Sequence, residues 1–166
     1  MDYIIRKMEA EDWGAVSKIY KDALAKGIST FERECPSYKE WDERHIAECR
    51  FAMTTDPDVA KEKIVGWCAL SKTSSRDAYK GVAEVSIYFD EDFQEKGLGT
   101  VLLNRLSEMS ECQGYYSLYA AIFSCNIASI ALHKKCGFRE IGYREKIARD
   151  IFGEWQNTTL MERRIK

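Results

Sequence analysis

The middle of the chain alternates hydrophobic and polar residues and then changes to a helical spacing. Between positions 82 and 89 the alternation has the two-residue period of a strand, with Val85, Ile87 and Phe89 on one face and Glu84, Ser86 and Tyr88 on the other. After an acidic turn, apolar residues recur with helical spacing from position 98 to 109. Gly97 and Gly99 stand at the start of that spacing. The pattern therefore predicts a central strand that leads through a glycine turn into a helix.

The rest of the chain also alternates between strand-like and helix-like segments. The pattern predicts strands at 3–8, 51–55, 64–72, 114–122, 142–148 and 154–161, and helices over 9–26, 37–46 and 126–136. Ser37 and Glu40 have the spacing of a capping box, and Gly27 and Gly137 are placed to end helices. This order, with a hairpin late in the chain, predicts a single α/β domain over 1–166, a sandwich around a mixed sheet.

Length, charge and cysteine content narrow the function classes. A chain of 166 residues fits one domain with a sizeable core, and its net charge of −2 argues against a nucleic-acid binder that relies on bulk positive charge. No leader-like or membrane-spanning apolar run is evident, so we expect a cytoplasmic protein without membrane contact. The six cysteines form no Cys-x-x-Cys pair, so we expect no metal site and buried, reduced thiols at Cys68 and Cys136.

The glycine turn has the chemistry of an anion site. A helix N-terminus presents free backbone N–H groups and the positive end of the helix dipole, and Gly97 and Gly99 bring no side chains that block close approach. A simpler explanation is a plain strand-to-helix connection whose glycines only ease a tight turn. The spacing of the glycines does not decide between the two.

Three motifs identify a family resemblance that covers nearly the whole chain. Gln94-x-x-Gly97-x-Gly99 resembles the acyl-CoA pyrophosphate loop of the GNAT acetyltransferases, and Asn126-x-x-Ser129-x-x-Leu132-His133-x-x-x-Gly137-Phe138 is similar to a second signature of that family. The segments at 29–41 and Arg76-x-Ala-Tyr79 resemble the phosphinothricin and methionine-sulfone N-acetyltransferases. The resemblance implies a three-layer α/β/α sandwich with a mostly antiparallel sheet, acetyl-CoA as co-substrate, and a homodimer with its substrate loop near the interface.

The resemblance also implies roles for individual residues. The positions that match acetyl-CoA contacts are Ile87, Tyr88, Phe89, Glu95, Lys96, Gly97, Leu98, Gly99, Thr100, Asn126 and Ser129. Phe31, Arg76 and Tyr79 match the side that holds the amine substrate, and a guanidinium such as that of Arg76 suits a carboxylate. Each has a simpler explanation, such as helix capping for Asn126 and an exposed, solvated side chain for Arg76.

Three candidates remain for proton transfer. Glu84 matches the acid that the subfamily uses, usually through water, to take the ammonium proton. Tyr88 and His133 compete as donors to the departing thiolate, and each has a structural explanation as a core aromatic or a helix histidine. His45 is interpreted as structural or exposed. The implied reaction is direct attack of the amino group of a small amino-acid analogue in a ternary complex, without an acyl-enzyme.

Other functions fit parts of the same pattern. The acceptor is alternatively a protein N-terminus, a polyamine or an aminoglycoside, although Arg76 and Lys80 in the loop before the central strand do not suit a polycation. A non-catalytic acyl-CoA sensor would keep the glycine turn for binding only. A cysteine acyltransferase would use Cys125 or Cys136, which lie near His133 in the sequence.

Overall fold

A seven-stranded sheet forms the middle layer of the molecule in the computed structural model, which describes residues 3–56, 58, 61–94 and 96–165. The strands are β1 (Tyr3–Lys7), β2 (His45–Thr55), β3 (Ile64–Lys72), β4 (Val82–Phe89), β5 (Ser117–Phe123), β6 (Arg139–Arg149) and β7 (Trp155–Arg164). The helices are α1 (Trp13–Lys26), α2 (Tyr38–Arg44), α3 (Leu98–Cys112) and α4 (Ile127–Lys135). Short 3-10 turns occupy Ala10–Asp12, Asp77–Tyr79 and Glu91–Phe93.

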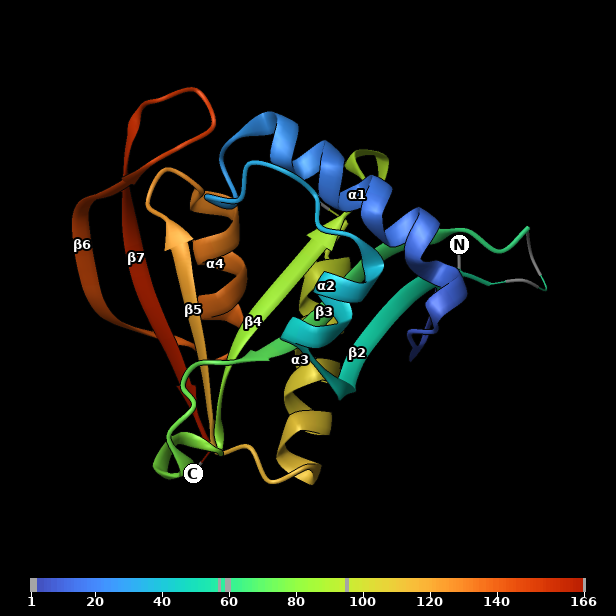
Figure 1. Cartoon of the computed structure of the whole chain (residues 1–166). Helices are drawn as coiled ribbons and strands as arrows, with labels where there is room; N and C mark the ends of the chain where they lie inside the picture. Colours follow the sequence, from blue (N-terminus) through green and yellow to red (C-terminus); the bar gives the residue numbers. More distant parts are fainter. Residues whose placement is uncertain (1–2, 57, 59–60, 95, 166) are drawn as a thin grey trace.

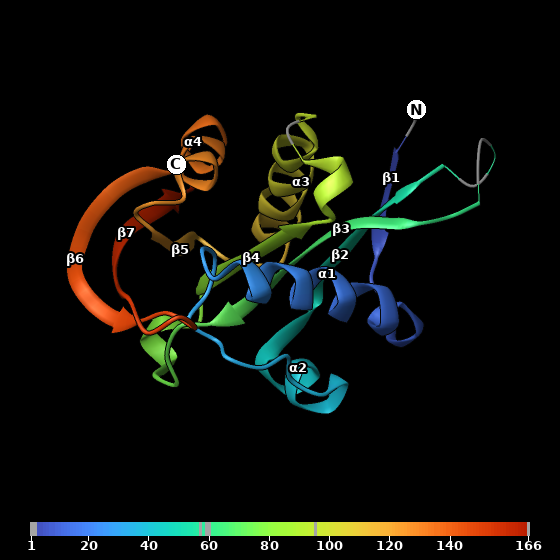
Figure 2. The same cartoon turned by 90° about the horizontal axis from the view of Figure 1, so that it is seen from above.

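The sheet is mixed but mostly antiparallel. Its strand order is β1-β2-β3-β4-β5-β7-β6, and β4 with β5 is the one parallel pair among these neighbours. Helices α1 and α2 cover one face and α3 and α4 the other, as seen from above in Figure 2. The predicted three-layer α/β/α sandwich is confirmed, and so is the antiparallel hairpin of β2 and β3. No helix in the described ranges is long and apolar enough to cross a membrane.

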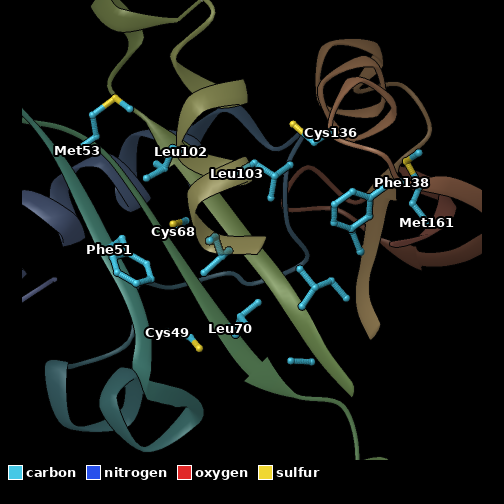
Figure 3. Close-up of a cluster of buried hydrophobic side chains, with 14 of the residues drawn as sticks. Cys49, Phe51, Met53, Cys68, Leu70, Leu102, Leu103, Cys136, Phe138 and Met161 are labelled. Atoms are coloured by element: carbon cyan, nitrogen blue, oxygen red, sulfur yellow. The ribbon is translucent and has the colours of Figure 1, made fainter. Parts of the chain in front are cut away.

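Two hydrophobic clusters fill the spaces between the layers. Under α3 and α4, side chains such as Leu102, Leu103 and Phe138 pack on Phe51 and Met161 from the sheet (Figure 3). On the other face the second cluster joins α1 and α2 to the sheet, and its large members are Tyr20, Trp41 and Trp67. Cys68 and Cys136 are buried free thiols in the first cluster, as predicted.

Local sequence signals set most helix ends. Gly27 closes α1 in a left-handed conformation with φ 66°, which a residue without a Cβ adopts freely. The Ser37 hydroxyl accepts from the Glu40 N–H while the Glu40 carboxylate accepts from the Ser37 N–H, so the predicted capping box is present.

The predicted end of α2 was wrong. The helix stops at Arg44, and His45 already begins β2, where it pairs with Ser71 of β3. Pairing with a strand far along the chain overrides the local helical spacing here, because it supplies backbone partners that the sequence pattern does not reveal.

The central strand parts from its parallel neighbour after a short stretch. β4 and β5 pair at Val82–Ser117, Ala83–Leu118 and Glu84–Tyr119, whereas β5 continues to pair with β7 as far as Phe123. Figure 1 shows the two strands diverging toward the glycine turn. The backbone of β4 beyond Glu84 is regular against β3, so the strand is splayed from β5 without a bulge against β3.

Candidate active site

A cavity of about 950 Å³ opens where β4 and β5 diverge. It runs from the N-terminus of α3 and the side of α4 to α1 and α2. The predicted site residues that line it are Phe31, Glu84, Ile87, Tyr88, Phe89, Gly97, Leu98, Gly99, Thr100, Asn126, Ser129 and His133. Residues separated by as much as a hundred positions in the sequence are therefore brought to one space.

A few predicted site residues lie elsewhere or outside the described part. Arg76 and Tyr79 are exposed in the loop between β3 and β4 and do not line the cavity of their own chain. The Lys96 ammonium lies 4.7 Å from the centre of the Phe93 ring and also lies outside the cavity lining. Glu95 falls outside the described residues.

Glu84 is half-buried on the face of β4 that looks toward α1 and α2. It lies opposite Ser71 of β3 and Tyr119 of β5, at the last pair before the strands part. Burial raises the pKa of its carboxyl group, because a charged carboxylate loses solvation there. Within the described part of the chain its carboxylate has no hydrogen-bond or ion-pair partner, so it is free to accept a proton from a bound molecule or water.

Tyr88 follows Glu84 on the same face, which agrees with the predicted alternation. Its ring lies 5.0 Å from the Trp67 ring and 5.0 Å from the Tyr20 ring, centre to centre. Burial raises the pKa of the Tyr88 phenol, so its hydroxyl keeps its proton at neutral pH. Tyr88 is therefore a neutral proton donor in the wall of the cavity.

His133 is held in one tautomer on α4. Its Nδ1 lies 2.8 Å from the Ser129 carbonyl oxygen, so Nδ1 carries the hydrogen and donates it. Burial lowers the pKa of His133, which is 2% exposed, and its Nε2 is buried without a partner among the described residues. The neutral ring therefore keeps a buried lone pair on Nε2, which is an acceptor.

The two turn glycines serve different purposes. Gly97 precedes α3 with φ 76°, and a Cβ built there would meet nothing within 4 Å. A Cβ at Gly99 would lie 3.0 Å from the Leu132 side chain of α4. The expectation that both glycines leave room for an anion therefore needs correction at Gly99, where the missing side chain allows α3 to approach α4. Leu98 and Gly99 line the cavity at the start of α3, where the first N–H groups of a helix have no acceptor within the helix, whereas the Thr100 N–H donates to the Gly97 carbonyl oxygen.

A group of aromatic residues that the sequence pattern does not predict as site residues lies at the other end of the cavity. Trp41, His45 and Trp67 all line it, although His45 was interpreted as structural or exposed. His45 stacks on Trp41 with ring centres 4.2 Å apart, and its Nδ1 donates to the Trp41 carbonyl oxygen at 2.7 Å. The one usable signal is the continuous apolar run over 64–70, which is typical of a strand buried on both faces and so places Trp67 in the interior.

The cysteines are not part of this site. Cys125 is exposed, and Cys136 is buried with its Sγ 3.8 Å from the Thr100 carbonyl oxygen. Neither lines the cavity, and burial raises the pKa of the Cys136 thiol, which opposes formation of a thiolate nucleophile. Among the described residues, no cluster of three His, Cys, Asp or Glu side chains is arranged to hold a metal ion.

Comparison with known proteins gives one consistent result. Residues 13–138 match the model of the Acetyltransferase (GNAT) family. The chain is 28% identical to an L-methionine sulfoximine/L-methionine sulfone acetyltransferase of Pseudomonas aeruginosa, over 98% of this chain and 94% of that protein. It is 30% identical to a phosphinothricin N-acetyltransferase of Alcaligenes faecalis, over 96% and 81% of the two chains. The structure of a GNAT superfamily phosphinothricin acetyltransferase of Sinorhizobium meliloti in complex with acetyl-CoA superposes with a TM-score of 0.87 at 27% identity, covering 99% and 89% of the chains.

Proposed function

Because the chain belongs to the acetyltransferase (GNAT) family, we propose that it acetylates the amino group of a small amino-acid analogue of the phosphinothricin, methionine sulfone or methionine sulfoximine type. The reaction is direct attack in a ternary complex with acetyl-CoA. The observation that carries the proposal is Glu84, a half-buried carboxylate with a raised pKa, placed in one cavity with the glycine turn of α3. The relatives named for these substrates match nearly the full chain.

The described residues fit acetyl-CoA, which supplies an activated acetyl group and a thiolate leaving group. The first amides of α3 suit the pyrophosphate, and the β4 backbone from Val85 to Phe89, which has left β5, offers groups for an extended arm. On α4, Asn126 and Ser129 line the same part of the cavity. The Asn126 side chain also caps α4 by accepting from the Ser129 N–H, so its contribution to binding comes in addition to capping.

In this mechanism Glu84 takes the proton of the substrate ammonium, through a water, so that the amine attacks in its neutral form. A carboxyl group whose pKa is raised is a stronger base than an ordinary one and is better matched to that proton. We assign the proton donor to Tyr88, because its buried phenol is protonated. Neutral His133 has its only ring hydrogen committed to Ser129, so its Nε2 accepts a hydrogen bond instead of donating a proton.

A homodimer is part of the proposal. β6 forms one edge of the sheet, and exposed apolar side chains gather on it and on the turn into β7: Ile141, Tyr143, Ile147, Phe152 and Trp155. Exposed apolar groups on an edge strand suit pairing with a second chain. Arg76 and Tyr79 do not reach the cavity of their own chain, and a dimer offers them the cavity of the partner.

The acceptor class is tested by an acceptor panel, measured as acetyl-CoA-dependent thiol release. We expect methionine sulfone, methionine sulfoximine or phosphinothricin to give the largest kcat/KM. Spermidine, an aminoglycoside and a peptide with a free N-terminus complete the panel. Preference for any of these three over every amino-acid analogue would overturn the assignment, and acetyl-CoA binding without turnover on any amine would support a sensor.

A further inference from the structure

Three polar side chains form a row across three neighbouring strands of the sheet. His45 at the start of β2 pairs with Ser71 of β3, and Ser71 pairs on its other side with Glu84 of β4. Residues directly opposite one another in antiparallel strands share a face, with Cβ atoms roughly 5 Å apart. All three residues line the cavity. This set, which we call the polar row, therefore leads from the proposed base along the cavity wall to the end of α2.

Ser71 stands in the middle of the polar row. It is half-buried, and its hydroxyl has no hydrogen-bond partner within the described ranges. A hydroxyl both donates and accepts, so it can take a proton on one side while it gives up its own on the other. From Glu84 to His45 the Cβ atoms span roughly 10 Å in two steps. Because the row borders the cavity, Ser71 and bound water suffice to connect its two ends.

His45 offers one ring nitrogen that is free to accept a proton. Its Nδ1 lies 2.7 Å from the Trp41 carbonyl oxygen, which only accepts, so Nδ1 carries the hydrogen and Nε2 holds the lone pair. The Nε2 of His133 is enclosed, whereas that of His45 remains accessible to solvent and has no partner in the described part of the chain. Stacking on Trp41, with ring centres 4.2 Å apart, fixes the ring. His45 is therefore an oriented acceptor.

Burial moves the pKa values of the two ends of the polar row toward each other. It raises the pKa of the Glu84 carboxyl and lowers the pKa of the His45 imidazole, because the charged form of each loses solvation. The charged side chains around His45 belong to two ion pairs, Arg50 with Asp42 and Arg44 with Glu32. A proton passes readily between groups whose pKa values lie close together. Proton transfer along the row is therefore not strongly uphill.

We propose that the polar row carries the ammonium proton of the acceptor away from the reaction centre. Protonated Glu84 gives its proton to the Ser71 hydroxyl oxygen, while the Ser71 hydroxyl hydrogen passes to Nε2 of His45, in each case directly or through water. The His45 imidazolium then releases the Nε2 proton to solvent, and all three residues return to their starting states. The inference rests on the proposed function of Glu84 as the base and adds the residues that restore that base in each turnover.

The test measures kcat for methionine sulfone from neutral pH up to the pKa of its amino group. His45→Gln and Ser71→Ala should each lower kcat at neutral pH by roughly tenfold, and the deficit should shrink as the substrate arrives deprotonated. Because the two residues act in series, the double variant should be no slower than the slower single variant. Trp13→Phe is the matched control, since its ring packs 5.5 Å from Trp41 and does not line the cavity.

Chemical rescue separates proton transfer from packing at His45. In His45→Ala, imidazole added to the solution should restore part of kcat at neutral pH, because it takes the proton in place of the missing side chain. Pyrazole has a ring of the same size but is a much weaker base, so it should restore nothing. Neither compound should accelerate the parent enzyme. A packing role for His45 predicts that the two compounds act alike.

Two results would overturn the relay. One is a kcat profile of folded His45→Gln and Ser71→Ala that coincides with that of the parent or runs parallel to it, and the other is a double variant in which the two losses multiply. If these variants match the parent while Glu84→Gln shows the deficit of a missing base, the relay fails and the proposed function stands. A parent enzyme that turns over no amine would remove the proposed function and the relay with it.

Discussion

At Glu84, burial opposes the negative charge that the proposed base needs. A carboxyl group whose pKa is raised on folding stabilises the protein below its ordinary pKa, and this contribution is lost as the pH rises through the folded value. At neutral pH an ionised Glu84 is therefore a local destabilisation, as expected of a residue retained for chemistry. A substitution that removes the charge of Glu84 distinguishes a catalytic role, in which activity falls, from a structural role, in which stability falls.

Glu84→Gln should lower kcat at neutral pH by roughly two to four orders of magnitude, because basicity is lost while volume is kept. The deficit should shrink as the pH approaches the pKa of the substrate amine, since more substrate then arrives deprotonated. Thermal melting at pH 7 should show the variant no less stable than the parent, with the difference disappearing in acid. Parallel pH profiles of two folded proteins that bind acetyl-CoA equally would exclude Glu84 as the base.

Substitutions at Tyr88 and His133 test which of the two residues donates the proton to the departing thiolate. Tyr88→Phe removes the protonated donor and should reduce kcat by at least about tenfold, with little change in the KM for acetyl-CoA. His133→Gln removes a buried acceptor, so its effect should fall on the KM for acetyl-CoA and leave the pH dependence of kcat unchanged. A basic limb of the kcat profile that vanishes in His133→Gln and persists in Tyr88→Phe would reverse the assignment.

At the scale of elements, the approach of α3 to α4 positions the proposed pyrophosphate site. α4 is held by the Asn126 cap at one end and by the Lys134–Glu140 ion pair near the other, and a Cβ at Gly99 would lie only 3.0 Å from its Leu132 side chain. The N-terminus of α3 thus depends on a contact between two helices as well as on its own glycine turn. A small change in this contact moves the amides that face the cavity.

Gly99→Ala should therefore raise the KM for acetyl-CoA while the fold is retained, because its methyl group displaces Leu132 or the start of α3. The double variant Gly99→Ala/Leu132→Ala should recover part of the loss, since the shortened side chain makes space. Steady-state kinetics of the parent, both single variants and the double variant measure this coupling. Strictly additive effects of the two substitutions would show that the helix contact is not the cause.

At the scale of the whole molecule, the two edges of the sheet differ in character. Figure 2 shows β6 and β1 at opposite edges of the sheet. β6 carries exposed apolar residues, whereas β1 exposes Ile4 as its large apolar residue. This asymmetry supports association through β6.

Tyr143→Asp places a charge on the β6 edge and should convert the proposed dimer into a monomer, because an unpaired carboxylate is costly to bury. Sedimentation at several concentrations measures the change, and the activity of the monomer should fall with it. Ile4→Asp on β1 is the matched control and should leave the oligomeric state unchanged. A monomeric parent protein would contradict the dimer and leave the base assignment at Glu84 intact.

The sequence by itself determined the local parts of this protein. The alternation over 82–89 identified the central strand and the faces of Glu84 and Tyr88, and Gly27 and the Ser37–Glu40 box identified helix ends, because these signals act within a few residues. The motifs at 94–99 and 126–138 identified the family for the same reason.

Only the tertiary structure decided where distant segments meet. It pairs His45 with Ser71 at the start of β2, packs Gly99 against Leu132, and brings Trp41 of α2 and Trp67 of β3 together in the cluster under α1 and α2. Sheet pairing and side-chain packing depend on residues far apart in the chain, so no local period encodes them. For the same reason the pKa shifts of Glu84 and His133 follow from burial, which exists only in the folded molecule.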